Sequence, residues 1–256
     1  MSLFTYAERI ANAQATKEPI EKITITNPTL TVDQAYEIQK ISMEQTLTAE
    51  NHFIGWKMGL TSVAKQQQVG VDSPIYGRLT SSMNLRRNEI IASDYIHPRV
   101  EAEVAFVFNK AVSGANLTPL DIWSSVESVY LALEVIDSRY QNFSFTLPDV
   151  IADNASSTKI WLSAQAFSPY ALDWSAVNVV LKQNGEEKLY GNGAAVLGHP
   201  IHSVIELLTL LAKEGRGILP GQLVLTGGIT DAIAVQAGDV IEADYGQLGK
   251  LTLFVK

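Results

Sequence analysis

The chain has 256 residues, which is long enough for one large domain or for a small domain packed on a bigger one. Its net charge of −8 at pH 7 and sequence pI of about 5.0 argue against nucleic acid or an anionic membrane as the main partner. The absence of cysteine excludes disulfides, thiolate nucleophiles, iron–sulfur clusters and cysteine-type zinc sites.

No targeting or membrane segment stands out in the sequence. The first residues lack a basic stretch followed by an apolar one, so they do not resemble a secretory signal. No uninterrupted apolar run approaches the roughly 18 residues that a transmembrane helix needs. We therefore expect a cytoplasmic protein.

Residues 1–50 have few glycines and no strand pattern, and we expect them to form an N-terminal helical arm or subdomain. Thr31 and Gln34 fit a capping box, in which each side chain bonds the other residue's backbone amide. The helix that it opens is expected to run to about Glu50. The side chains expected to face inward are Val32, Ala35, Tyr36, Ile38 and Ile41.

From residue 51 the sequence changes to short strands and glycine turns, which predicts a main domain over 51–256. Residues 53–58 read as a strand that carries Lys57 between two large apolar residues. A buried ammonium requires an anionic partner. The alternative is that Lys57 extends its charged end to the surface. A short helix over 61–69 and a loop containing Asp72 are expected to follow.

The segment from Val100 to Phe108 predicts a strand that is covered on both faces. Alternation places Glu101 and Glu103 on the same face, about 6.6 Å apart at roughly 3.3 Å per residue. At an effective dielectric constant of about 20, two negative charges at that distance repel by roughly 2.5 kcal/mol. A raised pKa, a paired cation or a bound metal ion must compensate.

Glu134 interrupts a second apolar strand-like run, residues 130–137. Three oxygen ligands without a soft ligand suit Mg²⁺ or Mn²⁺. The alternative is that these are ordinary glutamates facing outward from half-exposed strands.

The rest of the chain predicts a loop over a site at 141–150, small polar residues at 152–157, and a hairpin turning at Asn184-Gly185. An amphipathic helix is expected from Pro200 to Lys213, and strands follow to the end. Helices first and strands later indicate the α+β class with a mixed or mostly antiparallel sheet. The sequence lacks a P-loop, a G-x-S-x-G elbow, an H-E-x-x-H motif and a complete dinucleotide-binding glycine pattern.

Six motifs occur together in an order that resembles a known enzyme group. They are Gly55-Trp-Lys-Met-Gly-Leu-Thr-Ser62, Gly70-Val-Asp-Ser-Pro-Ile-Tyr-Gly77, His97-Pro-Arg-Val-Glu-Ala-Glu103, Glu134-Val-Ile-Asp-Ser-Arg-Tyr140, Ala152-Asp-Asn-Ala-Ser-Ser157 and Thr226-Gly-Gly-Ile-Thr230. Across residues 32–256 the chain is similar to the 2-oxopent-4-enoate hydratase and 4-oxalocrotonate decarboxylase group of the fumarylacetoacetate hydrolase superfamily.

The resemblance implies a curled mixed β-sheet, roll-like, with flanking helices. It implies Mg²⁺ or Mn²⁺ held by Glu101, Glu103 and Glu134, the same acids that the electrostatic argument selects. It also places further residues at the substrate site, namely Lys57, Asp72, Ser156, Ser157 and Thr226.

The implied activity is metal-dependent decarboxylation of 4-oxalocrotonate, in meta-cleavage catabolism of aromatic compounds. The stretch Asp137–Phe145 favours this lyase over its paralogue, 2-oxopent-4-enoate hydratase. C–C bond hydrolysis of an acylpyruvate and a role as a non-catalytic partner subunit are the remaining alternatives. The resemblance implies a small 2-oxo acid substrate and a homo-oligomer, and it allows a complex with the paralogous hydratase.

We expect Lys57 to neutralise an anionic substrate oxygen and Asp72 to carry or position a proton. Arg139 is expected to assist the distal carboxylate of the substrate. The aromatic residues 140–145 would form an apolar wall beside that carboxylate.

Overall fold

A computed structural model describes residues 1–62, 66–67, 71 and 73–256 of the chain. Its described helices are α1 (Leu3–Thr16), α2 (Ile23–Thr26), α3 (Val32–Glu44), α5 (Pro119–Trp123), α6 (Leu147–Ala152) and α7 (Pro200–Ala212). Its strands are β1 (Phe53–Gly59), β2 (Ile75–Thr80), β3 (Glu89–Ile90), β4 (Arg99–Phe108), β5 (Val112–Ser113), β6 (Val126–Ile136), β7 (Ser157–Leu162), β8 (Asn178–Gln183), β9 (Glu186–Asn192), β10 (Gly217–Ile218), β11 (Leu223–Leu225), β12 (Ile233–Ala234), β13 (Val240–Asp244) and β14 (Lys250–Val255).

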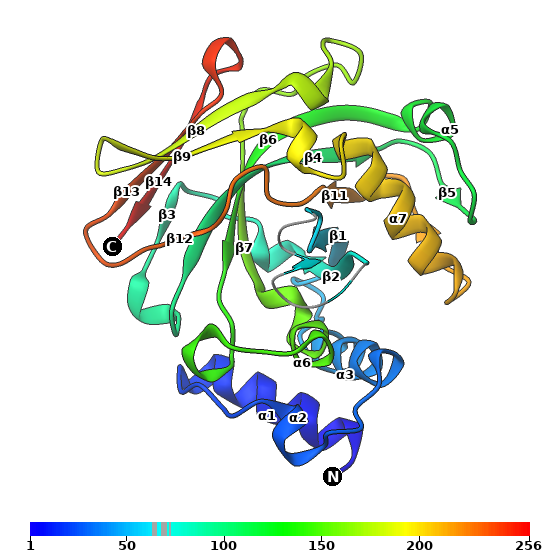
Figure 1. Cartoon of the computed structure of the whole chain (residues 1–256), viewed down its shortest axis with the longest axis vertical. Helices are drawn as coiled ribbons and strands as arrows, with labels where there is room; N and C mark the ends of the chain where they lie inside the picture. Colours follow the sequence, from blue (N-terminus) through cyan, green and yellow to red (C-terminus); the bar gives the residue numbers. More distant parts are fainter. Residues whose placement is uncertain (63–65, 68–70, 72) are drawn as a thin grey trace.

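The strands of the described residues form two main sheets. The larger sheet has the order β2-β1-β11-β4-β6-β7, with β12 also paired to β4. The second has the order β3-β14-β13-β8-β9, and β5 pairs with β10. Pairing is parallel between β1 and β11 and antiparallel between β4 and β6. Figure 1 shows β4 and β6 as long, bent neighbours that rise over β1 and β2. The predicted α+β class and curled mixed sheet are confirmed.

The N-terminal helices pack at one end of the molecule, beside α6 (Figure 1). The predicted capping box is present: Thr31 Oγ1 accepts from the amide of Gln34, whose side chain accepts from the amide of Thr31. Helix α3 ends at Glu44 rather than near Glu50, and Val32 is 37% exposed instead of facing inward. These helices share a buried cluster with α6. The division of the chain at residue 50 stays a prediction.

The predicted loop over 141–150 is wrong at its second half, because α6 begins at Leu147. The carboxylate of Asp149 accepts from the amide and the hydroxyl of Thr146, which closes a capping box. Pro148 stands in the first turn, where a helix tolerates a missing amide hydrogen. The helix predicted over 61–69 lies largely outside the described residues.

The second sheet and helix α7 match the expectations from the sequence. Asn184 and Gly185 join β8 to β9 with positive φ angles of 56° and 83°, as a type I′ turn requires. His199 caps α7, since its Nδ1 accepts from the amide of Ile201.

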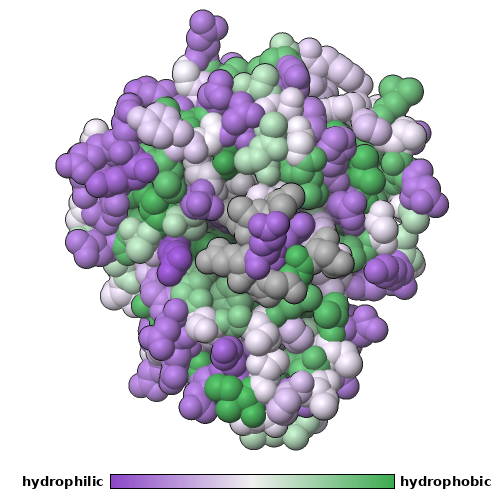
Figure 2. Space-filling model, viewed as in Figure 1, coloured by the Kyte–Doolittle hydropathy of each residue, from purple (hydrophilic) through white to green (hydrophobic). Residues whose placement is uncertain are grey.

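By length and hydropathy, residues Gly193–Ala212 would suffice to cross a membrane. In the structure, the apolar side of α7 is instead part of the main hydrophobic core, through residues such as Val204, Leu207 and Leu211. We therefore interpret α7 as a core helix. On the face shown in Figure 2, hydrophilic side chains surround much of the rim.

Candidate metal centre and active site

Three glutamates meet where β4 and β6 run side by side. Glu101 lies directly opposite Glu134 in the antiparallel register, and Glu103 follows two residues along β4 on the same face. One carboxylate oxygen from each residue lies within 4.8 Å of the other two. The exposed fractions are 6% for Glu101 and 0% for the other two. The structure thus brings the three predicted ligands together, and it does not place them on an outward face.

The electrostatics of this cluster disfavour three ionised carboxylates by themselves. Burial, together with the charges of Glu134 and Glu101, raises the pKa of Glu103 well above its usual value. Burial likewise raises the pKa of Glu134, although the nearby Lys57 works in the opposite direction. Without another cation, protonation would relieve this repulsion.

The donor set fits a divalent cation. Glu103 Oε1 is buried and accepts no hydrogen bond from the described residues. A buried oxygen of this kind calls for an ion or another unseen partner. Three carboxylates without a soft ligand suit Mg²⁺ or Mn²⁺. The residues present therefore fit the predicted metal.

Lys57 projects from β1 into the same cluster. Its Nζ lies 3.0 Å from Glu134 Oε2 and donates to the carbonyl of Ala155 at 3.1 Å. Only 2% of the residue is exposed, so the alternative of a surface-directed ammonium is wrong. Burial alone would lower its pKa, but the three glutamates together raise it. Lys57 is therefore a charged lysine fixed beside the candidate metal ligands.

A side-chain hydroxyl and a backbone amide hold two of the glutamates in place. Ser157 Oγ donates to Glu134 Oε1 at 2.7 Å, and the amide of Gly227 donates to Glu103 Oε2 at 2.8 Å. Gly227 has φ +109°, and a Cβ there would lie 2.1 Å from Thr61 Oγ1. Only glycine suits this close approach. The role of Gly227 was missed from the sequence, although the Thr-Gly-Gly run marked the turn.

The neighbouring Thr226 donates its hydroxyl to the carbonyl of Val104 at 3.0 Å. Ser157 thus contacts the cluster, whereas Thr226 precedes Gly227, and the hydroxyl groups of both residues bond protein atoms. Substrate contact by either residue stays a prediction.

The segment Asn154–Ser156 adopts an unusual backbone conformation beside the cluster. All three residues have positive φ angles between 51° and 57°. Asn154 is anchored to β2, because its side chain accepts from the amide of Arg78 and donates to the carbonyl of the same residue. Left-handed conformations of this kind are costly for residues other than glycine, and they cluster at functional sites. Here the turn aims the carbonyl of Ala155 at Lys57.

A cavity of about 630 Å³ opens from Glu101 and Lys57 toward solvent. Ser156 and Ile136 contribute to its wall, as does the segment 143–146. Arg99 also lines this cavity, with its guanidinium carbon 4.1 Å from the ring centroid of Phe143. The aromatic segment therefore covers the site, as the sequence predicted.

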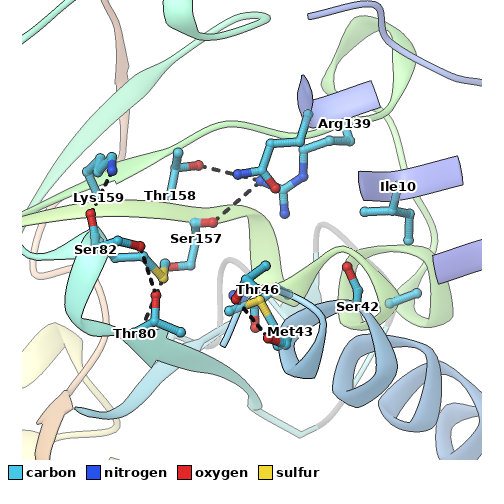
Figure 3. Close-up of a pocket in the computed structure, with 14 residues that line it drawn as sticks. Ile10, Ser42, Met43, Thr46, Thr80, Ser82, Arg139, Ser157, Thr158 and Lys159 are labelled. Carbon is cyan, nitrogen blue, oxygen red and sulfur yellow. Dashed lines mark hydrogen bonds between the residues drawn. The ribbon is translucent and has the colours of Figure 1, made fainter. Parts of the chain in front are cut away.

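Arg139 is not among the described residues that line this cavity. Its buried guanidinium pairs with Asp153 and donates to the carbonyls of Asp137 and Ser157. It lines a separate cavity of about 100 Å³ near α1 and α3, which Figure 3 shows. Burial raises the pKa of Asp153 to about 6, although Arg139 lowers it. Asp72, the predicted proton carrier, lies outside the described residues.

Comparisons with known proteins place the chain in one family. Residues 48–256 match the family model described as "Fumarylacetoacetate (FAA) hydrolase C-terminal". A 4-oxalocrotonate decarboxylase of Pseudomonas putida is 41% identical over 96% of this chain and 94% of its own length. A 2-keto-4-pentenoate hydratase of Paraburkholderia xenovorans is 35% identical over 96% of this chain and 91% of its own.

A solved structure of a relative has a closely similar fold. It is a 4-oxalocrotonate decarboxylase from Pseudomonas putida G7, complexed with magnesium and adipate. Its TM-score is 0.96 at 38% identity, and the match covers 99% of this chain and 97% of that one.

Proposed function

The chain belongs to the fumarylacetoacetate hydrolase family, and on that premise we propose that it is a Mg²⁺- or Mn²⁺-dependent lyase that decarboxylates 4-oxalocrotonate. The products are 2-hydroxypenta-2,4-dienoate and CO₂. The observation that carries this proposal is the cluster of Glu101, Glu103, Glu134 and Lys57, of which Glu101 and Lys57 line the cavity. The decarboxylase relatives supply the choice of substrate.

The reaction moves one electron pair along the substrate. The C5–C6 bond breaks, C6 leaves as CO₂, and a double bond forms between C4 and C5. The former C3–C4 double bond moves to C2–C3, and the 2-keto oxygen takes up the charge and then a proton. A bound divalent ion held by Glu101, Glu103 and Glu134 supplies positive charge that favours the enolate form of the 2-keto acid.

The protein's own groups support this movement of charge. Lys57 is fixed by Glu134 and the carbonyl of Ala155, so its ammonium can stabilise the oxygen that becomes negative. Phe143 and Ile136 give the outer cavity an apolar wall. Removal of water from a carboxylate raises its energy relative to neutral CO₂. Asp72 remains the candidate for delivering the proton.

The second candidate is hydration of 2-hydroxypentadienoate, which the 35% identical hydratase supports. Both reactions pass through the same dienol, so metal ligands and Lys57 would serve either one. Acylpyruvate hydrolysis would release two carboxylic acids instead. A non-catalytic subunit is disfavoured, because the glutamates and Lys57 are all present and assembled.

One assay separates these activities. Purified protein with Mg²⁺ is mixed with 4-oxalocrotonate or with 2-hydroxypentadienoate, with and without EDTA. The proposal expects CO₂ from the first substrate and loss of that activity in EDTA. Water addition to the second substrate without any CO₂ from the first would identify a hydratase.

We further propose that the enzyme works in the cytoplasm as a homo-oligomer. Light scattering coupled to size-exclusion chromatography measures the subunit number. Addition of the paralogous hydratase to the same column tests for a mixed complex, which a shift of both proteins to a shared earlier peak would support.

A further inference from the structure

Arg99 occupies the outer part of the cavity, on the same strand as two of the metal ligands. It is the first residue of β4, and alternation puts its side chain on the face of Glu101 and Glu103. It is half-buried and lines the cavity with Glu101. Its guanidinium lies 4.1 Å from the ring centroid of Phe143. Such stacking holds a guanidinium in one plane and leaves its edge available to a ligand.

The strand register gives the backbone spacing between Arg99 and Glu101 on β4. Glu101 pairs with Glu134, and one step outward Arg99 pairs with Ile136. A step of two residues along a strand is roughly 6.6 Å. Five carbon–carbon bonds of about 1.5 Å span roughly 6 to 7 Å when extended. The length of a six-carbon diacid therefore matches the backbone spacing between Arg99 and Glu101.

Two cations, Lys57 and Arg99, line the cavity and can meet an anionic substrate when a divalent ion neutralises the glutamates. Lys57 lies at the inner end beside Glu134, and Arg99 lies outward of Glu101. The acids lining the cavity are Glu101, which belongs to the candidate metal site, and the exposed Asp231. Among the described residues, Arg99 forms no salt bridge with a carboxylate. Arg139, in contrast, is fully engaged by Asp153 and by backbone carbonyls.

We propose that Arg99, positioned over the ring of Phe143, binds the distal carboxylate of a six-carbon 2-oxo diacid and thereby selects diacids over monoacids. This inference rests on the proposed function, which supplies the 2-oxo acid group at the inner end of the substrate. It replaces Arg139 with Arg99 as the residue that contacts the distal carboxylate. A planar guanidinium matches a carboxylate with two parallel hydrogen bonds.

The chemistry gives this contact a distinct kinetic signature. During decarboxylation, negative charge leaves the distal carboxylate and moves to the 2-keto oxygen. A contact to the departing group is therefore strongest before the bond breaks. Its loss raises KM more than it lowers kcat. The hydration substrate has no distal carboxylate, so its turnover does not depend on Arg99.

The test compares two ligands that differ only at the distal end, 2-oxoadipate and 2-oxohexanoate. Their binding to the Mg²⁺-loaded protein is measured by calorimetry for wild type, Arg99→Met and Arg99→Lys. We expect wild type to prefer the diacid by roughly 10- to 100-fold, as one charged hydrogen-bonded contact would give. Arg99→Met should remove this preference, and Arg99→Lys should retain part of it. The control Arg87→Met changes an exposed arginine outside the cavity and should keep the full preference.

Steady-state kinetics with 4-oxalocrotonate form the second readout, with an increase in KM larger than the decrease in kcat expected for Arg99→Met. Circular dichroism shows whether that variant folds, and Arg99→Lys serves if it does not. An unchanged diacid preference in Arg99→Met, or no preference in wild type, would overturn the inference. Absence of CO₂ release by wild type would reject the proposed function, while the binding comparison would still test Arg99.

Discussion

Two buried charge clusters lie near one another in this protein, and they are built differently. Arg139 and Asp153 form a matched pair, in which the guanidinium also donates to backbone carbonyls. The other cluster gathers Glu101, Glu103 and Glu134 around the ammonium of Lys57, and it leaves Glu103 Oε1 without a described donor. A buried pair can offset its desolvation when, as here, further hydrogen bonds satisfy the remaining donors. A surplus of buried acids needs a further cation, and we therefore expect a structural role for the first cluster and metal binding for the second.

The largest expected effect comes from the unmatched cluster. Glu103→Gln keeps the size of the side chain but removes a predicted metal ligand, so we expect turnover to fall on the order of 1,000-fold, equivalent to about 4 kcal/mol. The fold should survive, because like-charge repulsion is also removed. The measurement is CO₂ release at saturating Mg²⁺, with Glu127→Gln on the exposed side of β6 as the control. Full activity in Glu103→Gln would exclude it as a ligand.

Disruption of the pair formed by Arg139 and Asp153 should instead lower the stability of the protein. Asp153→Asn leaves the buried Arg139 without its carboxylate, and we expect the free energy of unfolding to fall by about 3 kcal/mol. Urea denaturation measures the change, and the exposed Asp94→Asn provides the control. If Asp153→Asn lowered metal affinity but left stability unchanged, the distinction between the two clusters would fail.

A smaller effect is expected for Ser157, which contacts the predicted ligand Glu134. Ser157→Ala removes the hydroxyl that donates to Glu134 Oε1 at 2.7 Å. Groups that orient a metal ligand affect metal affinity by about 10- to 100-fold, and we expect the lower end of that range here. Calorimetric titration with Mn²⁺ measures it, against Ser113→Ala on exposed β5. An equal affinity for both variants would assign Ser157 to a different role.

The smallest expected effect is a dependence of the free energy of unfolding on pH in the metal-free protein. Burial raises the folded-state pKa values of Glu103 and Glu134, so the folded protein retains protons that the unfolded chain loses near pH 4.3. Stability should therefore fall as pH increases from about 4.3 through the raised pKa values. Bound metal should reduce this slope, because the ion replaces the protons.

Thermal unfolding between pH 5 and pH 7.5, with and without Mg²⁺, checks the sign. Glu103→Gln should flatten the slope of the metal-free protein. A metal-free protein that becomes more stable as pH rises, with no difference in Glu103→Gln, would contradict the electrostatic description of the cluster.

Local sequence patterns predicted much of the frame that carries the site. Alternation along Val100–Phe108 placed Glu101 and Glu103 on one face, and the structure agrees because this strand pairs on both of its edges. The capping box at Thr31 and the Asn-Gly turn at 184–185 depend on residues close in sequence, and both formed.

What the residues alone could not supply depends on contacts between distant segments. The pairing of Glu101 with Glu134 requires the register of two strands, whereas the motif resemblance implied only that these acids share a metal with Glu103. From the sequence, Arg139 is a candidate cation for binding substrate. Its pairing with Asp153 depends on the turn at 154–156, which the sequence does not predict. Gly227 acts through a backbone amide, which no side-chain pattern reveals.

The central claim is that Glu101, Glu103 and Glu134 together bind one divalent ion. Calorimetric titration of metal-free protein with Mn²⁺ tests it most directly. We expect one ion per chain for wild type and Glu127→Gln, and a loss of that binding in Glu103→Gln and Glu134→Gln. Equal stoichiometry and affinity in all four proteins would contradict it.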